Sequence, residues 1–81
     1  MITVYGKPEC TDWARSRAIL DSAKIEYTFH DILADPSAAS IAVEISGGTA
    51  SPVIVFDDDS FLVEPSDPAL TDKLRSEGIV S

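Results

Sequence analysis

The chain has 81 residues with a formal net charge of −8, from 14 acidic and 6 basic side chains, and 44% of its residues are hydrophobic. We expect a single domain over residues 1–81, because a chain this short cannot divide its apolar residues between two cores. The acidic balance excludes nucleic acid and membrane surfaces as expected partners, since the chain would repel their phosphates. No apolar run approaches the ~20 residues of a membrane span.

Cys10 is the only cysteine, so no disulfide can form within the chain. A chain without disulfides is typical of a reducing compartment, and we expect a cytoplasmic protein. Residues 1–5 lack the basic start and the long apolar stretch of a secretion signal. We also expect a monomer, whose surface acidity favours solubility.

The first part of the chain predicts a strand followed by a helix. Residues 2–5 are β-branched or aromatic and end at Gly6, a pattern typical of a strand. A short loop then leads to a helix over roughly residues 11–24, with Cys10 or Thr11 as its N-cap. The side chains that share the apolar face of this helix are Trp13, Ser16, Ile19, Leu20 and Ala23.

A second strand and a second helix follow. Residues 26–32 alternate between apolar and polar side chains, which predicts a strand with one buried face. Asp35 and Pro36 mark the start of the helix as its cap and first residue, and Gly47 ends it. The side chains on the apolar face of this helix are Ala38, Ile41, Ala42 and Ile45.

The last part of the chain predicts a hairpin and a helix. The apolar run 53–56 is typical of a buried strand, and residues 61–63 return beside it after a turn. Ser66 and Pro68 mark the start of a helix in which Leu70 and Leu74 pack inward. The order is therefore β-α-β-α-β-β-α. The first two strands run parallel because a helix crosses between them, so the sheet is mixed and four-stranded.

Cys10 is the leading candidate for chemistry because it lies where a helix begins. A helix N-terminus carries partial positive charge and unpaired N–H groups, which favour a thiolate over a thiol. The thiolate is the attacking species in disulfide exchange. Basic side chains at positions 7, 15 and 17 would add to this potential, and acidic ones at 9 and 12 would oppose it. The alternative is a buried cysteine that acts as a small apolar side chain.

Three short segments carry a family resemblance. Residues 4–10, Val-Tyr-Gly-Lys-Pro-Glu-Cys, precede the first helix, Ser51-Pro52 precedes the third strand, and Glu-Pro-Ser-Asp at 64–67 precedes the last helix. Together they resemble the glutaredoxin family, including the mycoredoxins and the small redoxins that feed ribonucleotide reductase. The resemblance implies a thioredoxin-like α/β fold, with a four-stranded mixed sheet flanked by three helices. It also implies that Pro52 is a cis-proline facing the thiol.

The segment around Cys10 departs from the family in ways that limit the chemistry. Dithiol members have Cys-x-x-Cys, whereas Trp13 stands in the place of the second cysteine, so a two-thiol mechanism within one chain is impossible. The Cys-Gly-Phe-Ser motif of the iron–sulfur monothiol members is also missing. Asp12 replaces the usual aromatic residue, and Ala50-Ser51 replaces Thr-Val before the proline.

By resemblance, a cycle with one thiol remains open. Cys10 would attack a mixed disulfide between a client protein and a low-molecular-weight thiol, either glutathione or mycothiol, and a second small thiol would regenerate it. Lys7 would pair with a carboxylate of the small thiol, and the Ser51 backbone would bind it like an added strand. We expect no metal and no tightly bound cofactor. The small-thiol site implied by the resemblance consists of Lys7, Thr11, Asp12, Trp13, Ser51, Pro52, Ser66 and Asp67.

Three other features have structural interpretations. We expect Trp13 to be a core anchor, and the alternative is a partly exposed ring beside the thiol. His30 has no second histidine or cysteine to complete a metal site, and we expect it on the surface or at a strand edge. The acidic run 57–59 lacks the glycine and distal glutamate of a calcium loop and predicts a solvated turn.

Three functions from different classes follow from these observations. The first is a monothiol glutaredoxin-like or mycoredoxin-like thiol–disulfide oxidoreductase that works through Cys10. The second is a non-catalytic thioredoxin-fold binding module, favoured by the missing second cysteine. The third is an iron–sulfur carrier in which two copies of Cys10 bridge a cluster, and we rank it last because Trp13 would crowd the site.

Overall fold

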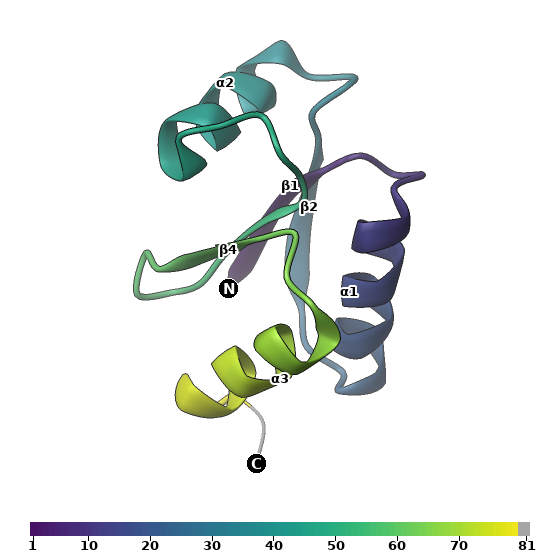
Figure 1. Cartoon of the computed structure of the whole chain (residues 1–81), viewed down its shortest axis with the longest axis vertical. Coiled ribbons are helices and arrows are strands. Elements are labelled where there is room, and N and C mark those ends of the chain that lie inside the picture. The colour runs from purple at the N-terminus through teal and green to yellow at the C-terminus, as the bar shows by residue number, and fades with distance from the viewer. Residues whose placement is uncertain (80–81) are drawn as a thin grey trace.

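The computed structural model describes residues 1–79 and shows the predicted order of strands and helices (Figure 1). The elements are β1 (Ile2–Gly6), α1 (Thr11–Ser22), β2 (Tyr27–Asp31), α2 (Pro36–Ser46), β3 (Val53–Val55), β4 (Phe61–Val63) and α3 (Asp67–Ser76). The predicted thioredoxin-like α/β arrangement is confirmed. Within residues 1–79, every helix is too short or too polar to cross a membrane.

The four strands form one mixed sheet in the order β2-β1-β3-β4. β1 lies in the middle, parallel to β2 and antiparallel to β3, and β4 pairs antiparallel with β3. In this register Val4 is opposite Phe29 on one side and Ile54 on the other. β2 is therefore an edge strand of the sheet. His30 lies on this strand, which confirms the prediction of a strand-edge position, and its ring stacks on Tyr5 with centroids 5.1 Å apart.

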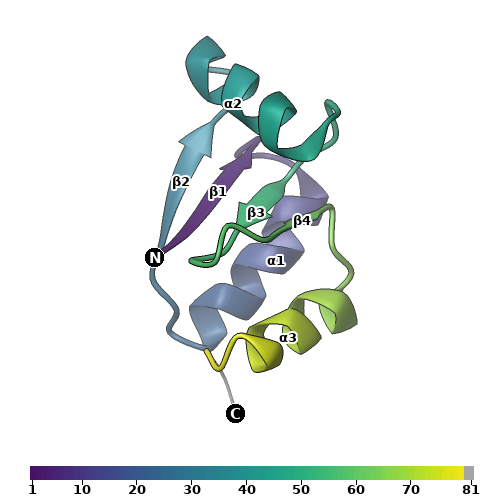
Figure 2. The same ribbon diagram turned by 90° about the vertical axis from the view of Figure 1, so that its left-hand side faces the viewer.

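The main core lies between the sheet and the helices α1 and α3, which lie close together (Figure 2). Alternate side chains of β1 point to this face, as the two-residue period of a strand requires. Leu70 and Leu74 of α3 are fully buried, as predicted from their spacing of one helical turn. The buried core residues are Ile2, Val4, Trp13, Leu20, Ile54, Phe56, Leu70 and Leu74.

α2 packs mainly against the sheet, where it contacts β1, β2 and β4. Small side chains form this contact. Ala38 and Ala42 are 3% and 6% exposed, so the helix approaches the sheet along this line. Ile41 is 43% exposed, and its predicted place on the buried face is wrong. Ile41 lies on the flank of the line between the two alanines, and a close approach through alanine leaves that flank turned to solvent.

Several predicted boundaries need correction. α1 ends at Ser22 rather than near residue 24, because Lys24 adopts a left-handed conformation with φ of 57° and the Ile25 N–H bonds back to the Leu20 carbonyl at 2.9 Å. Ala23 is exposed in consequence, and its predicted place on the apolar face is wrong. β2 is one residue shorter at each end than predicted, and β3 ends at Val55 instead of residue 56.

Candidate functional site

Cys10 lies at the corner between β1 and α1. The chain turns directly after Gly6, and the Cys10 N–H donates to the Lys7 carbonyl at 3.1 Å. Cys10 is the N-cap of α1, with φ −73° and ψ 131°, and its carbonyl accepts the Ala14 N–H at 2.9 Å. The free thiol is half-buried, packs against the core and makes no capping hydrogen bond. A thiol that is partly open to solvent therefore stands at the start of a helix.

Pro52 packs against the end of β1, next to this corner. The pairing of Tyr5 with Val53 brings Gly6 beside Pro52. A Cβ atom on Gly6 would lie 3.3 Å from the Cβ of Pro52, so the missing side chain permits this close approach. The Ser51–Pro52 peptide bond is cis, as predicted. Ser51 is 7% exposed, and within residues 1–79 no backbone hydrogen bond engages its N–H or carbonyl group.

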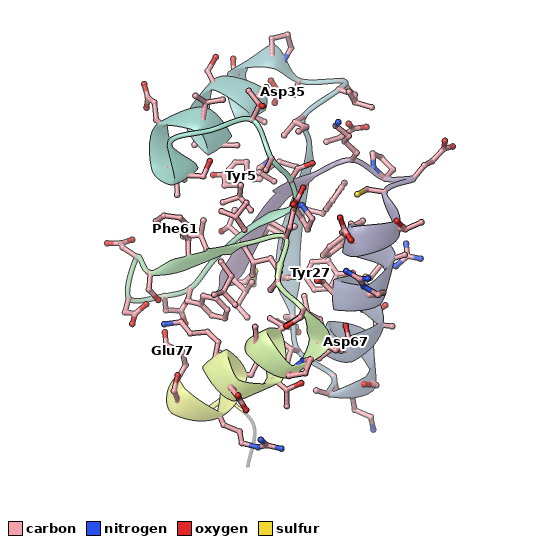
Figure 3. The ribbon with its side chains drawn as sticks, in the orientation of Figure 1. Tyr5, Tyr27, Asp35, Phe61, Asp67 and Glu77 are labelled. Atoms are coloured by element: carbon pink, nitrogen blue, oxygen red, sulfur yellow. The ribbon has the colours of Figure 1, made fainter. Side chains whose placement is uncertain are left out.

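The first turn of α3 faces α1, and Asp67 marks this place in Figure 3. Ser66 caps α3 by accepting the Ala69 N–H at 3.3 Å. Arg15 of α1 donates to Asp12 at 2.7 Å, and its Nε lies 4.0 Å from the Asp67 carboxylate. A cavity of about 260 Å³ opens here, lined by Arg15, Ser66, Asp67 and Pro68. The start of α3 and the Arg15 side chain of α1 thus line one cavity.

The structure distributes the predicted small-thiol residues over more than one place. Lys7 and Cys10 lie in the loop that follows β1, and Ser51 and Pro52 lie before β3, where Pro52 approaches Gly6 at the end of β1. Asp12, Ser66 and Asp67 gather around Arg15. Thr11 is exposed as the first residue of α1. Lys7 is also exposed, and it pairs with no carboxylate in the described part of the chain. An exposed lysine with no ion pair in this range suits a ligand that carries a carboxylate.

Trp13 is turned away from the α1–α3 cavity. It is 2% exposed, its ring stacks on Phe29 with centroids 5.0 Å apart, and it meets Tyr27 edge-on at 5.4 Å. Because Trp13 and Arg15 are two residues apart on a helix, they project to nearly opposite sides. The prediction of a core anchor is confirmed, and the alternative of an exposed ring beside the thiol is wrong.

Arg15 is the site residue that the sequence patterns did not single out. It was expected only to add positive potential, whereas it joins α1 to α3 through Asp12 and Asp67. The spacing of Asp12 and Arg15, three residues apart on a helix, is a known signal for such a pair. The contact with Asp67 depends on how the two helices pack, and no local pattern encodes it.

Comparison with known proteins decides the family. The glutaredoxin family model matches residues 2–61. This chain belongs to the glutaredoxin family. The matched segment contains Cys10 and Pro52 but ends before Ser66, so the start of α3 is compared through structure alone. The family and the fold support a role of the thiol–disulfide oxidoreductase type, with thiols or disulfides as partners.

Solved structures resemble the chain over nearly its full length. The thioredoxin-like protein BC3987, solved as a mutant, has a TM-score of 0.80 at 18% identity, covering 98% of this chain and 96% of that one. The glutaredoxin from Archaeoglobus fulgidus has a TM-score of 0.76 at 19% identity, covering 91% and 85%. The glutaredoxin from Brucella melitensis has a TM-score of 0.66 at 26% identity, covering 95% and 79%. No curated protein matches the chain significantly.

Proposed function

We propose that this protein is a monothiol thiol–disulfide oxidoreductase that acts in the cytoplasm as a monomer. Its substrates are mixed disulfides between client proteins and glutathione or mycothiol, and its nucleophile is Cys10. One observation carries the proposal: Cys10 is the half-buried N-cap of α1, and within residues 1–79 its thiol makes no hydrogen bond. The loop that carries it follows Gly6, which Pro52 approaches closely. A helix N-terminus stabilises the thiolate that disulfide exchange requires.

The reaction needs one cysteine and two small thiols. The Cys10 thiolate attacks the small-thiol sulfur of the mixed disulfide, so a new S–S bond forms as the old one breaks and the client leaves as a thiolate that takes up a proton. The thiolate of a second small thiol then attacks the small-thiol sulfur bound to Cys10. The small-thiol disulfide leaves with the two small thiols oxidised, and Cys10 returns to its thiolate.

Residues around the thiol would hold the small thiol. Lys7 is exposed and unpaired within residues 1–79, which suits it to a carboxylate of the ligand. The Ser51 backbone has no partner in the same range and would pair with the ligand as an added strand. Thr11 and Asp12 in the first turn of α1, and Ser66 and Asp67 in that of α3, would border the rest of the ligand. Trp13 would contribute from within the protein by holding the first turn of α1.

The test is an exchange assay with a peptide joined by a disulfide to glutathione, repeated with mycothiol in its place. We expect the wild type to release the peptide thiol catalytically when the free small thiol is supplied, and Cys10→Ser to be inactive. Ser40→Ala is the control, because it removes an exposed hydroxyl group on α2, outside the proposed site, and it should keep full activity. Equal rates for the wild type and Cys10→Ser would refute the proposal.

A non-catalytic binding module is the second candidate. Its support is the buried Trp13 in the place of a second thiol, which leaves Cys10 without an internal partner. This candidate predicts that client binding survives Cys10→Ser unchanged and that neither protein turns over a mixed disulfide. The iron–sulfur carrier stays a prediction, and anaerobic reconstitution that yields a colourless protein would exclude it.

A further inference from the structure

A larger cavity lies on the opposite side of α1, against β2. It measures about 430 Å³ and is lined by Pro8, Trp13, Arg17, Tyr27, Phe29 and Asp31. This volume is within the range of small-molecule sites, about 300–1,000 Å³. The cavity shares no lining residue with the α1–α3 cavity beside Asp67. Of the residues proposed above for the small-thiol site, Trp13 alone lines this cavity, and there its proposed part is to hold the first turn of α1.

Aromatic side chains from α1 and β2 form the wall of this cavity, because the period of each element directs them to the space between the two. Tyr27 and Phe29 are two residues apart on β2 and share the sheet face that α1 covers. Trp13 stacks on Phe29, with planes 19° apart, and meets the Tyr27 ring nearly at right angles. Trp13 is buried behind these two rings, so Tyr27 and Phe29 supply most of the exposed aromatic surface, and such a surface suits another aromatic ring.

Two charged side chains of opposite sign line the cavity, Arg17 from α1 and Asp31 from β2. Arg17 lies one helical turn after Trp13, and within residues 1–79 it forms no ion pair, although the chain holds 14 acidic residues. Arg15 and Arg75, in contrast, both pair with carboxylates. Burial and the Asp21 carboxylate raise the pKa of Tyr27, and the Arg17 cation opposes them, so Arg17 acts on the Tyr27 end of the wall.

Asp31 stands at the other end of β2, about 13 Å from Tyr27 along the strand. One of its oxygens already accepts the N–H groups of Leu33 and Ala34, at 2.9 and 3.3 Å. The carboxylate is thus held in place, and its second oxygen has no partner within residues 1–79. It would accept a hydrogen bond from a ligand and repel a second anionic group.

We propose that this cavity binds a small aromatic monocarboxylate with a hydrogen-bond donor opposite the acid group. The ring lies against the aromatic wall, the carboxylate pairs with Arg17, and the donor points to Asp31. Arginine binds carboxylates through two parallel hydrogen bonds, which explains a lone arginine at the rim of an apolar cavity. This site is independent of the redox function proposed above and needs no reaction at Cys10.

Trp13 is the only tryptophan, so its fluorescence reports on this cavity directly. The probe is 4-hydroxyphenylacetate, titrated while tryptophan alone is excited. We expect a saturable change in Trp13 emission, unaltered in Cys10→Ser. Tyramine, which carries an amine in place of the acid, should bind far more weakly. N-acetyltyrosinamide, which keeps the phenol but is neutral, should do so too.

Arg17→Gln is the decisive variant, and we expect it to lower the affinity about tenfold or more, the loss typical of a charge-assisted hydrogen bond. Arg17 is exposed, so the substitution leaves the core intact. The matched control is Arg75→Gln on α3, which should bind like the wild type. An absent or unsaturable response, or equal affinity for Arg17→Gln and the wild type, would overturn the proposal. Equal affinity for N-acetyltyrosinamide would also overturn it and would point to a protein side chain as the occupant.

Discussion

The three helices begin in two different ways. At α2, Asp35 accepts the N–H groups of Ser37 and Ala38, and at α3 Ser66 accepts that of Ala69. Both helices also carry proline in their first turn, where its missing N–H and fixed φ favour helix formation. At α1 the N-cap residue is Cys10, and its side chain makes no capping bond.

What holds the start of α1 is packing instead of a cap. Trp13 occupies the third position of the helix, where Ala38 and Ala69 receive capping bonds in the other two helices. Its ring is buried against Phe29 and Tyr27. The comparison teaches that a helix anchored by a buried ring does not need a capping side chain, so the Cys10 thiol at the N-cap position is left without a capping bond.

The largest expected effect comes from Cys10→Ser, which gives α1 a serine at its N-cap position, as α3 has. Disulfide exchange should be abolished, while the free energy of unfolding should rise by up to about 1 kcal/mol, because serine is a good N-cap. Activity assays and urea unfolding measure the two changes. Cys10→Ala is the control, since it removes the thiol without adding a cap. A Cys10→Ser protein less stable than Cys10→Ala would show that capping is irrelevant at this position.

Trp13→Ala removes the anchor and should destabilise the protein by about 3–5 kcal/mol, the usual cost of deleting a buried large aromatic side chain. Urea unfolding followed by circular dichroism measures the change. Trp13→Phe keeps a ring to stack on Phe29 and should lose much less. A loss below about 1 kcal/mol for Trp13→Ala would mean that the start of α1 is held by something other than this packing.

Asp35→Ala and Ser66→Ala remove the caps of α2 and α3, and each should cost about 0.5–2 kcal/mol. The same unfolding measurement applies, and Ser40→Ala, an exposed serine inside α2, is the control for loss of a hydroxyl group. Neither variant is expected to approach the cost of Trp13→Ala. If Asp35→Ala or Ser66→Ala cost as much unfolding free energy as Trp13→Ala, the proposed difference between helix starts held by a cap and by packing would be contradicted.

The smallest expected effect lies at the other end of α3. Burial and the neighbouring Asp58 carboxylate raise the pKa of Glu77, although Lys73 opposes them. A carboxyl group whose pKa is higher in the folded state destabilises that state once it ionises, so stability falls as pH rises through this region. Glu77→Gln should therefore raise the melting temperature slightly at neutral pH and leave it unchanged near pH 3, where both proteins are uncharged at this position. Glu44→Gln is the matched control, and a gain that persisted near pH 3 would contradict the explanation.

Local signals were sufficient for most of the fold and for the centre of the site. Asp35 and Ser66 cap where they were expected because capping depends on residues within one turn. Cys10, predicted with Thr11 as a candidate N-cap, occupies the N-cap position of α1 but makes no side-chain capping bond. The cis bond at Pro52 was predicted through the family resemblance. The misplaced end of α1 had no such signal, since Lys24 takes a conformation in which glycine is usually found.

The sequence by itself determined the order of strands and helices, the capped starts of α2 and α3, and the presence of one cysteine at the start of α1, because each depends on neighbours along the chain. The tertiary structure decided which side of α1 each residue faces. It placed Arg15 beside Asp67, and Trp13 and Arg17 in a cavity against β2. These contacts depend on the positions of separate elements in space, and periodicity within one helix does not specify which neighbour covers each face.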